Sequence, residues 1–165
     1  MAALEAGMTA PDFTLAGRNG DKVSLAESLK KGLVLAAFFK ISCPTCQYTF
    51  PLLERLFKAY AGGPVIVLGV SQNDRKKTDD FAREYGVTFP LLLDDPGAYL
   101  ASNTYGLTTV PSIFLISPGG KIEVSSVGWS KRDFEDLNTR VAKATGASPA
   151  QIFKPGEDVV EFKAG

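Results

Sequence analysis

The two cysteines of this chain, Cys43 and Cys46, are separated only by Pro44 and Thr45. The thiolate is the nucleophilic form of cysteine, and two thiols three positions apart can form and exchange a disulfide. A bridge this local closes too short a loop to add much stability to the fold. The pair therefore indicates redox chemistry rather than a structural cross-link.

The neighbouring sequence places the pair between a strand and a helix. Residues 33–39 are apolar throughout, which is typical of a buried strand, and apolar residues recur at helical spacing after Cys46. A helix N-terminus offers unpaired N–H groups and a positive dipole end, and both stabilise an anion at Cys43. Pro44 suits the first helical position. We therefore predict that Cys43 attacks a substrate disulfide and that the deeper Cys46 resolves the mixed disulfide.

The composition excludes several other chemistries. The chain has no histidine, which removes Cys–His catalysis and the mixed Cys/His zinc sites, and two cysteines alone cannot complete a zinc site of four ligands. Its 18 basic and 18 acidic residues cancel, so no basic footprint for nucleic acid is expected. We expect no cofactor and no metal. The expected partners are protein or small-molecule disulfides and thiols, together with an electron donor that the sequence does not identify.

The sequence also bears on the compartment. No apolar run approaches the roughly 18 residues of a membrane span. Residues 1–10 include Glu5, lack Lys and Arg, and have no sustained apolar core, which is unlike a signal peptide. The chain as written is therefore predicted to be cytoplasmic. The alternative is a periplasmic or other extracytoplasmic protein from which a leader has been removed.

Hydrophobic periodicity and turn residues predict a mixed α/β protein. Strands are expected at 13–15, 22–25, 33–39, 65–70, 89–93, 112–116 and 121–127, and helices after the cysteines and at 74–85, 98–105 and 130–146. The turn at Asn19-Gly20 makes the first two strands a β-hairpin. Alternation of strands with helices predicts parallel pairing, with an antiparallel edge from the late hairpin. Residues 1–165 are expected to form a single domain, with 148–165 a C-terminal extension outside this plan.

Two segments resemble the thioredoxin superfamily: residues 34–46 followed by Pro51, and residues 110–116. The resemblance implies a thioredoxin fold, with a central mixed sheet flanked by helices, and a thiol–disulfide oxidoreductase activity. It also implies that the bond before Pro111 is cis, and that this loop faces the cysteines and offers backbone groups to an extended substrate. Without the resemblance, Pro111 could simply begin a strand.

A finer resemblance is to the TlpA-like and redoxin branch, which is related to the AhpC/TSA superfamily. It rests on the opening residues 11–15, an inserted helix–strand segment at 78–93 and the turn at 117–121. Two positions depart from classical thioredoxins: Ala37 stands where they have a buried Asp, and Ser42 where they have Trp. The proton relay to Cys46 must then come from elsewhere.

Two charged residues are candidates to support the cysteines. TlpA-like proteins have an acidic residue just after the next strand, and Asp74 lies there. Asp74 either serves Cys46 as a base or simply caps a helix. Lys40, three residues before Cys43, either favours its thiolate by charge or is a solvated surface lysine.

The main competing function is a peroxiredoxin-like thiol peroxidase with Cys43 as the peroxidatic cysteine and antioxidant activity. Peroxiredoxins precede that cysteine with a Pro-x-x-x-Thr pattern, whereas Ala36 and Lys40 occupy those positions here. A copper-handling redoxin would need a histidine that the chain lacks. A third alternative is a binding module in which the 148–165 extension recruits a partner.

Overall fold

The computed structural model describes residues 3–165, in which seven strands form one sheet in the order β2-β1-β5-β4-β3-β6-β7. The strands β1 to β7 are, in chain order, Thr14–Gly17, Lys22–Ser24, Leu33–Phe39, Val65–Ser71, Leu91–Leu93, Ser112–Ile116 and Ile122–Val127. The helices α1 to α5 are Leu25–Leu29, Pro44–Ala59, Arg75–Tyr85, Leu100–Thr104 and Lys131–Thr145. Two further strands, β8 (Trp129–Ser130) and β9 (Phe162–Lys163), pair only with each other.

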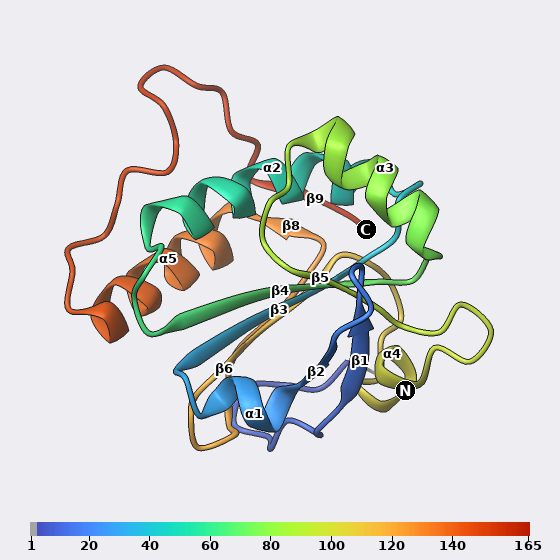
Figure 1. Cartoon of the computed structure of the whole chain (residues 1–165). Coiled ribbons are helices and arrows are strands. Elements are labelled where there is room, and N and C mark those ends of the chain that lie inside the picture. The colour runs from blue at the N-terminus through green and yellow to red at the C-terminus, as the bar shows by residue number, and fades with distance from the viewer. Residues whose placement is uncertain (1–2) are drawn as a thin grey trace.

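Helices cover both faces of this sheet (Figure 1). Alternate side chains of β3 point to opposite faces. Leu35 and Phe39 join a core with residues of α2, α3 and α5, while Val34 and Phe38 join a second core with residues of α1 and α4. This double burial explains why β3 is apolar at every position. The expected thioredoxin fold, a mixed sheet flanked by helices, is confirmed.

The pairing of β3 differs on its two sides. It runs parallel to β4, with Phe39 opposite Ser71, but antiparallel to β6. Alternation of strands and helices had predicted parallel pairing. The reason is that the chain between β5 and β6 stays at the edge where β4 ends: Asp94 N–H donates to the carbonyl of Ser71 at 2.9 Å. The chain therefore enters β6 from that edge and runs the opposite way.

The N-terminal hairpin extends the sheet through β1, which pairs antiparallel with both β2 and β5. The expected second strand is shorter than predicted because Leu25 begins α1. Ser24 caps this helix by accepting from Glu27 N–H at 3.0 Å. A helix of five residues is too short for its apolar periodicity to be recognised in the sequence.

Residues 148–165 pack along α2 and α5 (Figure 1). The guanidinium of Arg55 binds Glu157 through two hydrogen bonds of 2.8 and 3.0 Å, and this holds the pKa of Glu157 at about 2. The indole N–H of Trp129 donates to the carbonyl of Val160 at 2.8 Å, and Val159 is buried. The extension is thus part of the packed structure, for which the sequence pattern gave no indication.

None of the helices within residues 3–165 combines the length and apolar character that crossing a bilayer requires.

Candidate functional site

The cysteine pair lies where β3 ends and α2 begins. Cys43 is the N-cap residue of α2, and its sulfur accepts a hydrogen bond from the Cys46 N–H at 3.2 Å. Pro44 occupies the first turn of the helix. Both cysteines are free thiols; Cys43 is half-buried and Cys46 is fully buried. A nucleophile at a helix N-terminus is well placed to react as a thiolate.

The two sulfurs differ in burial, and the buried one holds its proton more tightly than an ordinary thiol does. Burial raises the pKa of the Cys46 thiol well above its ordinary value of 9.0, and its hydrogen bond with Cys43 acts in the same direction. Cys46 is therefore protonated at neutral pH, and it must lose a proton before it can attack a disulfide. This difference divides the pair into an accessible thiol and a buried, protonated one.

Two side chains fix the loop before Cys43: that of Asn73, just after β4, and that of Gln47, on α2. The Ile41 N–H donates to Asn73 Oδ1 at 2.9 Å, and Gln47 Nε2 donates to the Ile41 carbonyl at 2.9 Å. Asn73 follows β4, which pairs with β3 along its full length, so the two strand ends are neighbours. Asn73 was not predicted from the sequence. Its position directly before Asp74, after a buried strand, was the available signal.

The Val110–Pro111 peptide bond is cis, as the resemblance implied. The Cys43 thiol donates to the Val110 carbonyl at 3.4 Å, so this loop lies against the more exposed sulfur. Ser112 Oγ donates to the Thr109 carbonyl at 2.9 Å and holds the loop from within. The structure thus brings Cys43, Cys46 and the Pro111 loop together.

Asp74 is exposed and caps α3. Its Oδ1 accepts from the Lys77 N–H at 2.9 Å. Among the hydrogen bonds found within residues 3–165, none joins Asp74 to either cysteine. The capping alternative accounts for its geometry, and a role as base toward Cys46 stays a prediction.

A polar hollow opens on one side of the cis-proline loop. Lys40 and Gln72 line it together with residues 107–110. Gln72 is held in place by its amide, which donates to Ser102 Oγ at 3.0 Å. The Ser102 N–H and hydroxyl both donate to the fully buried carboxylate of Asp94. Lys40, which the sequence marked as a possible influence on Cys43, is exposed at the rim of this hollow.

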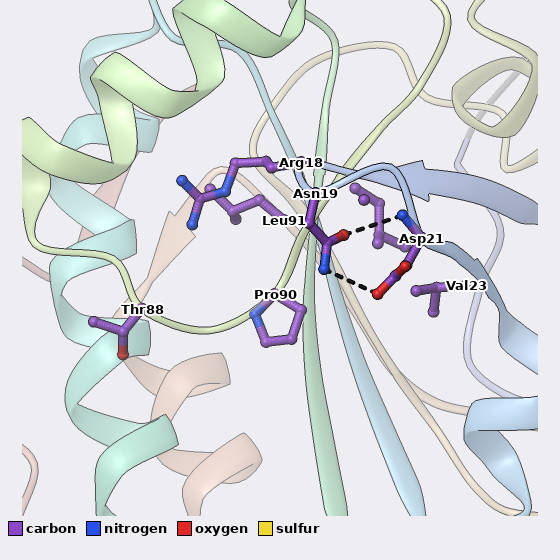
Figure 2. Close-up of a pocket in the computed structure, with 9 residues that line it drawn as sticks. Arg18, Asn19, Asp21, Val23, Thr88, Pro90 and Leu91 are labelled. Carbon is purple, nitrogen blue, oxygen red and sulfur yellow. Dashed lines mark hydrogen bonds between the residues drawn. The ribbon is translucent and has the colours of Figure 1, made fainter.

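A second, larger hollow lies at the β1–β2 turn and the start of β5, outside the cysteine loop (Figure 2). Its polar side chains already have partners. Asn19 and Asp21 bond each other at 2.9 and 3.1 Å, and Arg18 pairs with Asp79 at 3.1 Å. This hollow offers no group with redox chemistry. Within residues 3–165 there is also no cluster of three or more His, Cys, Asp or Glu side chains that could hold a metal.

Comparison with known proteins agrees with this geometry, since residues 6–125 match the AhpC/TSA family. The chain belongs to the AhpC/TSA family. It is 33% identical to the thiol-disulfide oxidoreductase ResA of Geobacillus thermodenitrificans over 73% of this chain and 68% of that protein. It is 31% identical to ResA of Geobacillus kaustophilus over 81% of this chain and 76% of that protein.

The fold has a close match among solved structures. The thioredoxin domain of a thiol-disulfide oxidoreductase from Bacteroides vulgatus superposes with a TM-score of 0.74 and 23% identity, over 84% of this chain and 98% of that domain. At 23% identity, this match supports only a shared fold. Together with its family relatives, it makes this AhpC/TSA chain an enzyme of the thiol–disulfide oxidoreductase class with a thioredoxin fold. The prediction of a TlpA-like redoxin is confirmed.

Proposed function

We propose that Cys43 and Cys46 form the redox couple of this enzyme, with Cys43 as the attacking thiol and Cys46 as the resolving thiol. The observation that supports this most strongly is their unequal burial at the start of α2: Cys43 is half-buried at the helix cap, and Cys46 is completely enclosed. A substrate sulfur can approach only the first of them.

The reaction proceeds in two exchanges. The thiolate of Cys43 attacks one sulfur of a substrate disulfide, which forms a mixed disulfide and releases the other substrate sulfur as a thiolate. Cys46 then loses its proton and attacks Sγ of Cys43, which releases the second substrate thiol and leaves a Cys43–Cys46 disulfide. The substrate gains two electrons, and a thiol donor returns the enzyme to the dithiol form. The same steps in reverse oxidise a dithiol substrate.

The loop at Pro111 is proposed to position the substrate. Its preceding carbonyl, that of Val110, already lies 3.4 Å from the sulfur of Cys43. A substrate chain that pairs with this backbone would carry its own sulfur into reach of Cys43. We propose protein or small-molecule disulfides as substrates.

Reduction of insulin disulfides by a thiol donor, set beside reduction of cumene hydroperoxide, tests this function. We expect the enzyme to accelerate insulin reduction and the Cys43→Ser variant to lose that activity. Peroxide reduction that is fast while insulin reduction stays at the uncatalysed rate would support the peroxidase alternative instead, with Cys43 as the peroxidatic cysteine.

A further inference from the structure

The end of the extension lies directly on the cysteine motif. Thr45 Oγ1 donates to the Ala164 carbonyl at 2.6 Å, although the two residues are far apart in sequence. Figure 1 shows the C-terminal end of the chain near the N-terminal end of α2. Thr45 is only 5% exposed. The extension therefore covers one side of the dithiol motif.

The same segment also contacts the loop that carries the cis-proline. A Cβ atom on Gly165 would collide with the Val110 carbonyl oxygen and would lie 2.8 Å from Thr109 Oγ1. On the other side, a Cβ atom on Gly128 would lie 2.7 Å from the carbonyl oxygen of Lys163. The backbone of residues 162–165 thus fits closely between the start of α2, the loop at Val110 and the end of β7.

Cys43 and the extension meet at one carbonyl group. The Val110 oxygen accepts from the Cys43 thiol at 3.4 Å, and Gly165 packs against that same oxygen. Under the proposed function, this backbone is where an extended substrate chain would lie. Residues 162–165 occupy part of the space that such a chain needs.

The segment is anchored from outside the site. The Val160 N–H donates to the Tyr48 hydroxyl at 3.2 Å, and the Lys131 N–H donates to the Glu161 carbonyl at 2.9 Å. Strands β8 and β9 then pair Ser130 with Phe162. The side chain of Phe162 is 62% exposed, so its backbone, not its ring, fixes the position. These anchors hold the last residues in place without any contribution from a substrate.

We propose that residues 162–165 restrict which disulfides reach Cys43. By lying against Thr45 and the Val110 carbonyl, they hinder extended protein chains that need this space. Small disulfides, and chains that approach from the open side lined by Lys40 and Gln72, still reach the sulfur. This inference rests on the proposed function for its consequence in catalysis. The structural part of the inference, that these residues limit access to Cys43, does not depend on that function.

Two variants remove the obstruction in different ways. A chain that ends at Glu161 lacks the four residues but keeps the Val160 and Glu161 anchors. Gly165→Val keeps all residues of the segment and places a side chain against the Val110 carbonyl, which displaces the end of the segment. Phe162→Ser is the matched control, because it changes an exposed ring and leaves the backbone contacts intact.

Access is measured first by alkylation of Cys43 in the reduced proteins, with a maleimide on a bulky polymer and with iodoacetamide. We expect the rate of Cys43 alkylation by the bulky maleimide to rise roughly two- to tenfold in both variants, which is the factor that one neutral hydrogen bond contributes. The rate with iodoacetamide should change less. Phe162→Ser should match the parent chain. Equal bulky alkylation in all four proteins would overturn the inference, and this readout requires no disulfide reductase activity.

Catalysis is then compared with insulin and with a small aromatic disulfide as substrates. The two variants should gain in kcat/KM for insulin by a similar factor and change little for the small disulfide. An equal gain for both substrates would contradict a size-selective role. If no protein reduces either substrate, the proposed function fails, and the alkylation rates still decide whether the segment limits access.

Discussion

At the scale of single residues, the site is an arrangement of two sulfurs with different surroundings. The Cys43 sulfur accepts a hydrogen bond from the Cys46 N–H at the helix cap and lies against the Val110 carbonyl, whereas Cys46 is enclosed by the core. Because burial raises the pKa of the Cys46 thiol, the second exchange needs a route for its proton.

Asp74 is the acidic side chain for which we predict a part in that proton transfer. Asp74→Asn should slow resolution of the mixed disulfide, most visibly below neutral pH, while attack by Cys43 stays nearly unchanged. Asparagine still accepts the Lys77 N–H, so the α3 cap and the stability are retained. Single-turnover rates for the two exchanges, measured across pH, test this. If resolution is unchanged, Asp74 is only a helix cap.

Of the features of the candidate site, the cysteine pair was the easiest to predict from the sequence. Spacing and placement alone predicted Cys43 and Cys46 as a redox pair, because two thiols at a strand-to-helix junction have few other uses. The contacts of Asn73 and Thr45 were not predictable, since each depends on a partner brought close by the fold: Ile41 in the first case and Ala164 in the second.

At the scale of elements, α2 has to be held rigidly because it carries both sulfurs. Glu54 on its buried face is 5% exposed and accepts from the Thr88 N–H at 2.8 Å, the Phe89 N–H at 3.3 Å and the Thr88 hydroxyl. This carboxylate joins α2 to the segment that leads into β5. Its role could not be predicted from the sequence, since a lone Glu on a helix usually faces solvent.

Glu54→Ala is therefore expected to destabilise the protein by about 1–3 kcal/mol, because it leaves the buried Phe89 N–H and the partly buried Thr88 N–H without an acceptor. Glu54→Gln keeps one carbonyl oxygen for those donors and should cost less. Denaturant unfolding of the reduced proteins measures both changes. A loss in Glu54→Ala no larger than that in Glu54→Gln would contradict the assignment.

Some of the shortest helices and strands could not be predicted from sequence patterns. The long helices were predicted because each presents several turns of one apolar periodicity, and the long buried strands because each is a continuous apolar run. Helix α1 and strands β8 and β9 were missed, because five-residue and two-residue elements present no repeat. The two-residue strands exist only because Trp129 and Phe162 lie on segments that the fold brings together.

At the scale of the whole molecule, one edge of the seven-stranded sheet holds the dithiol and the cis-proline loop, and the separate β8–β9 pair brings residues 162–165 to the same place. The mixed α/β class followed from the order of elements. The antiparallel direction of β6 did not, because it depends on the path of residues 94–111 along one edge of the sheet.

The whole molecule should also lose stability in alkali. The folded-state pKa of Cys46 is raised above its ordinary value of 9.0, and burial likewise raises the pKa of Tyr105 above 10.0. Each group holds a proton in the folded state that the unfolded chain releases. The associated stability is complete below about pH 9 and is lost as pH rises toward the folded pKa, at about 1.4 kcal/mol per pH unit for each group.

Denaturant unfolding of the reduced protein, measured from about pH 7 to about pH 11, checks this, because that range spans the ordinary pKa values of both groups. Cys46→Ala should abolish the part of the decline that begins near the ordinary value of 9.0 and keep the part that belongs to Tyr105. An unaltered alkaline profile in Cys46→Ala would show that Cys46 is not the buried, protonated thiol described here.

The division of labour between the two sulfurs is tested most directly by trapping the mixed disulfide. Cys46→Ser and Cys43→Ser are each incubated with a disulfide substrate, and covalent adducts are identified by mass spectrometry without reductant. We predict that Cys46→Ser accumulates an adduct on Cys43, because nothing resolves it, and that Cys43→Ser accumulates none, because its remaining sulfur is buried. An adduct on Cys46 in the Cys43→Ser variant, formed as fast as that on Cys43, would contradict the account.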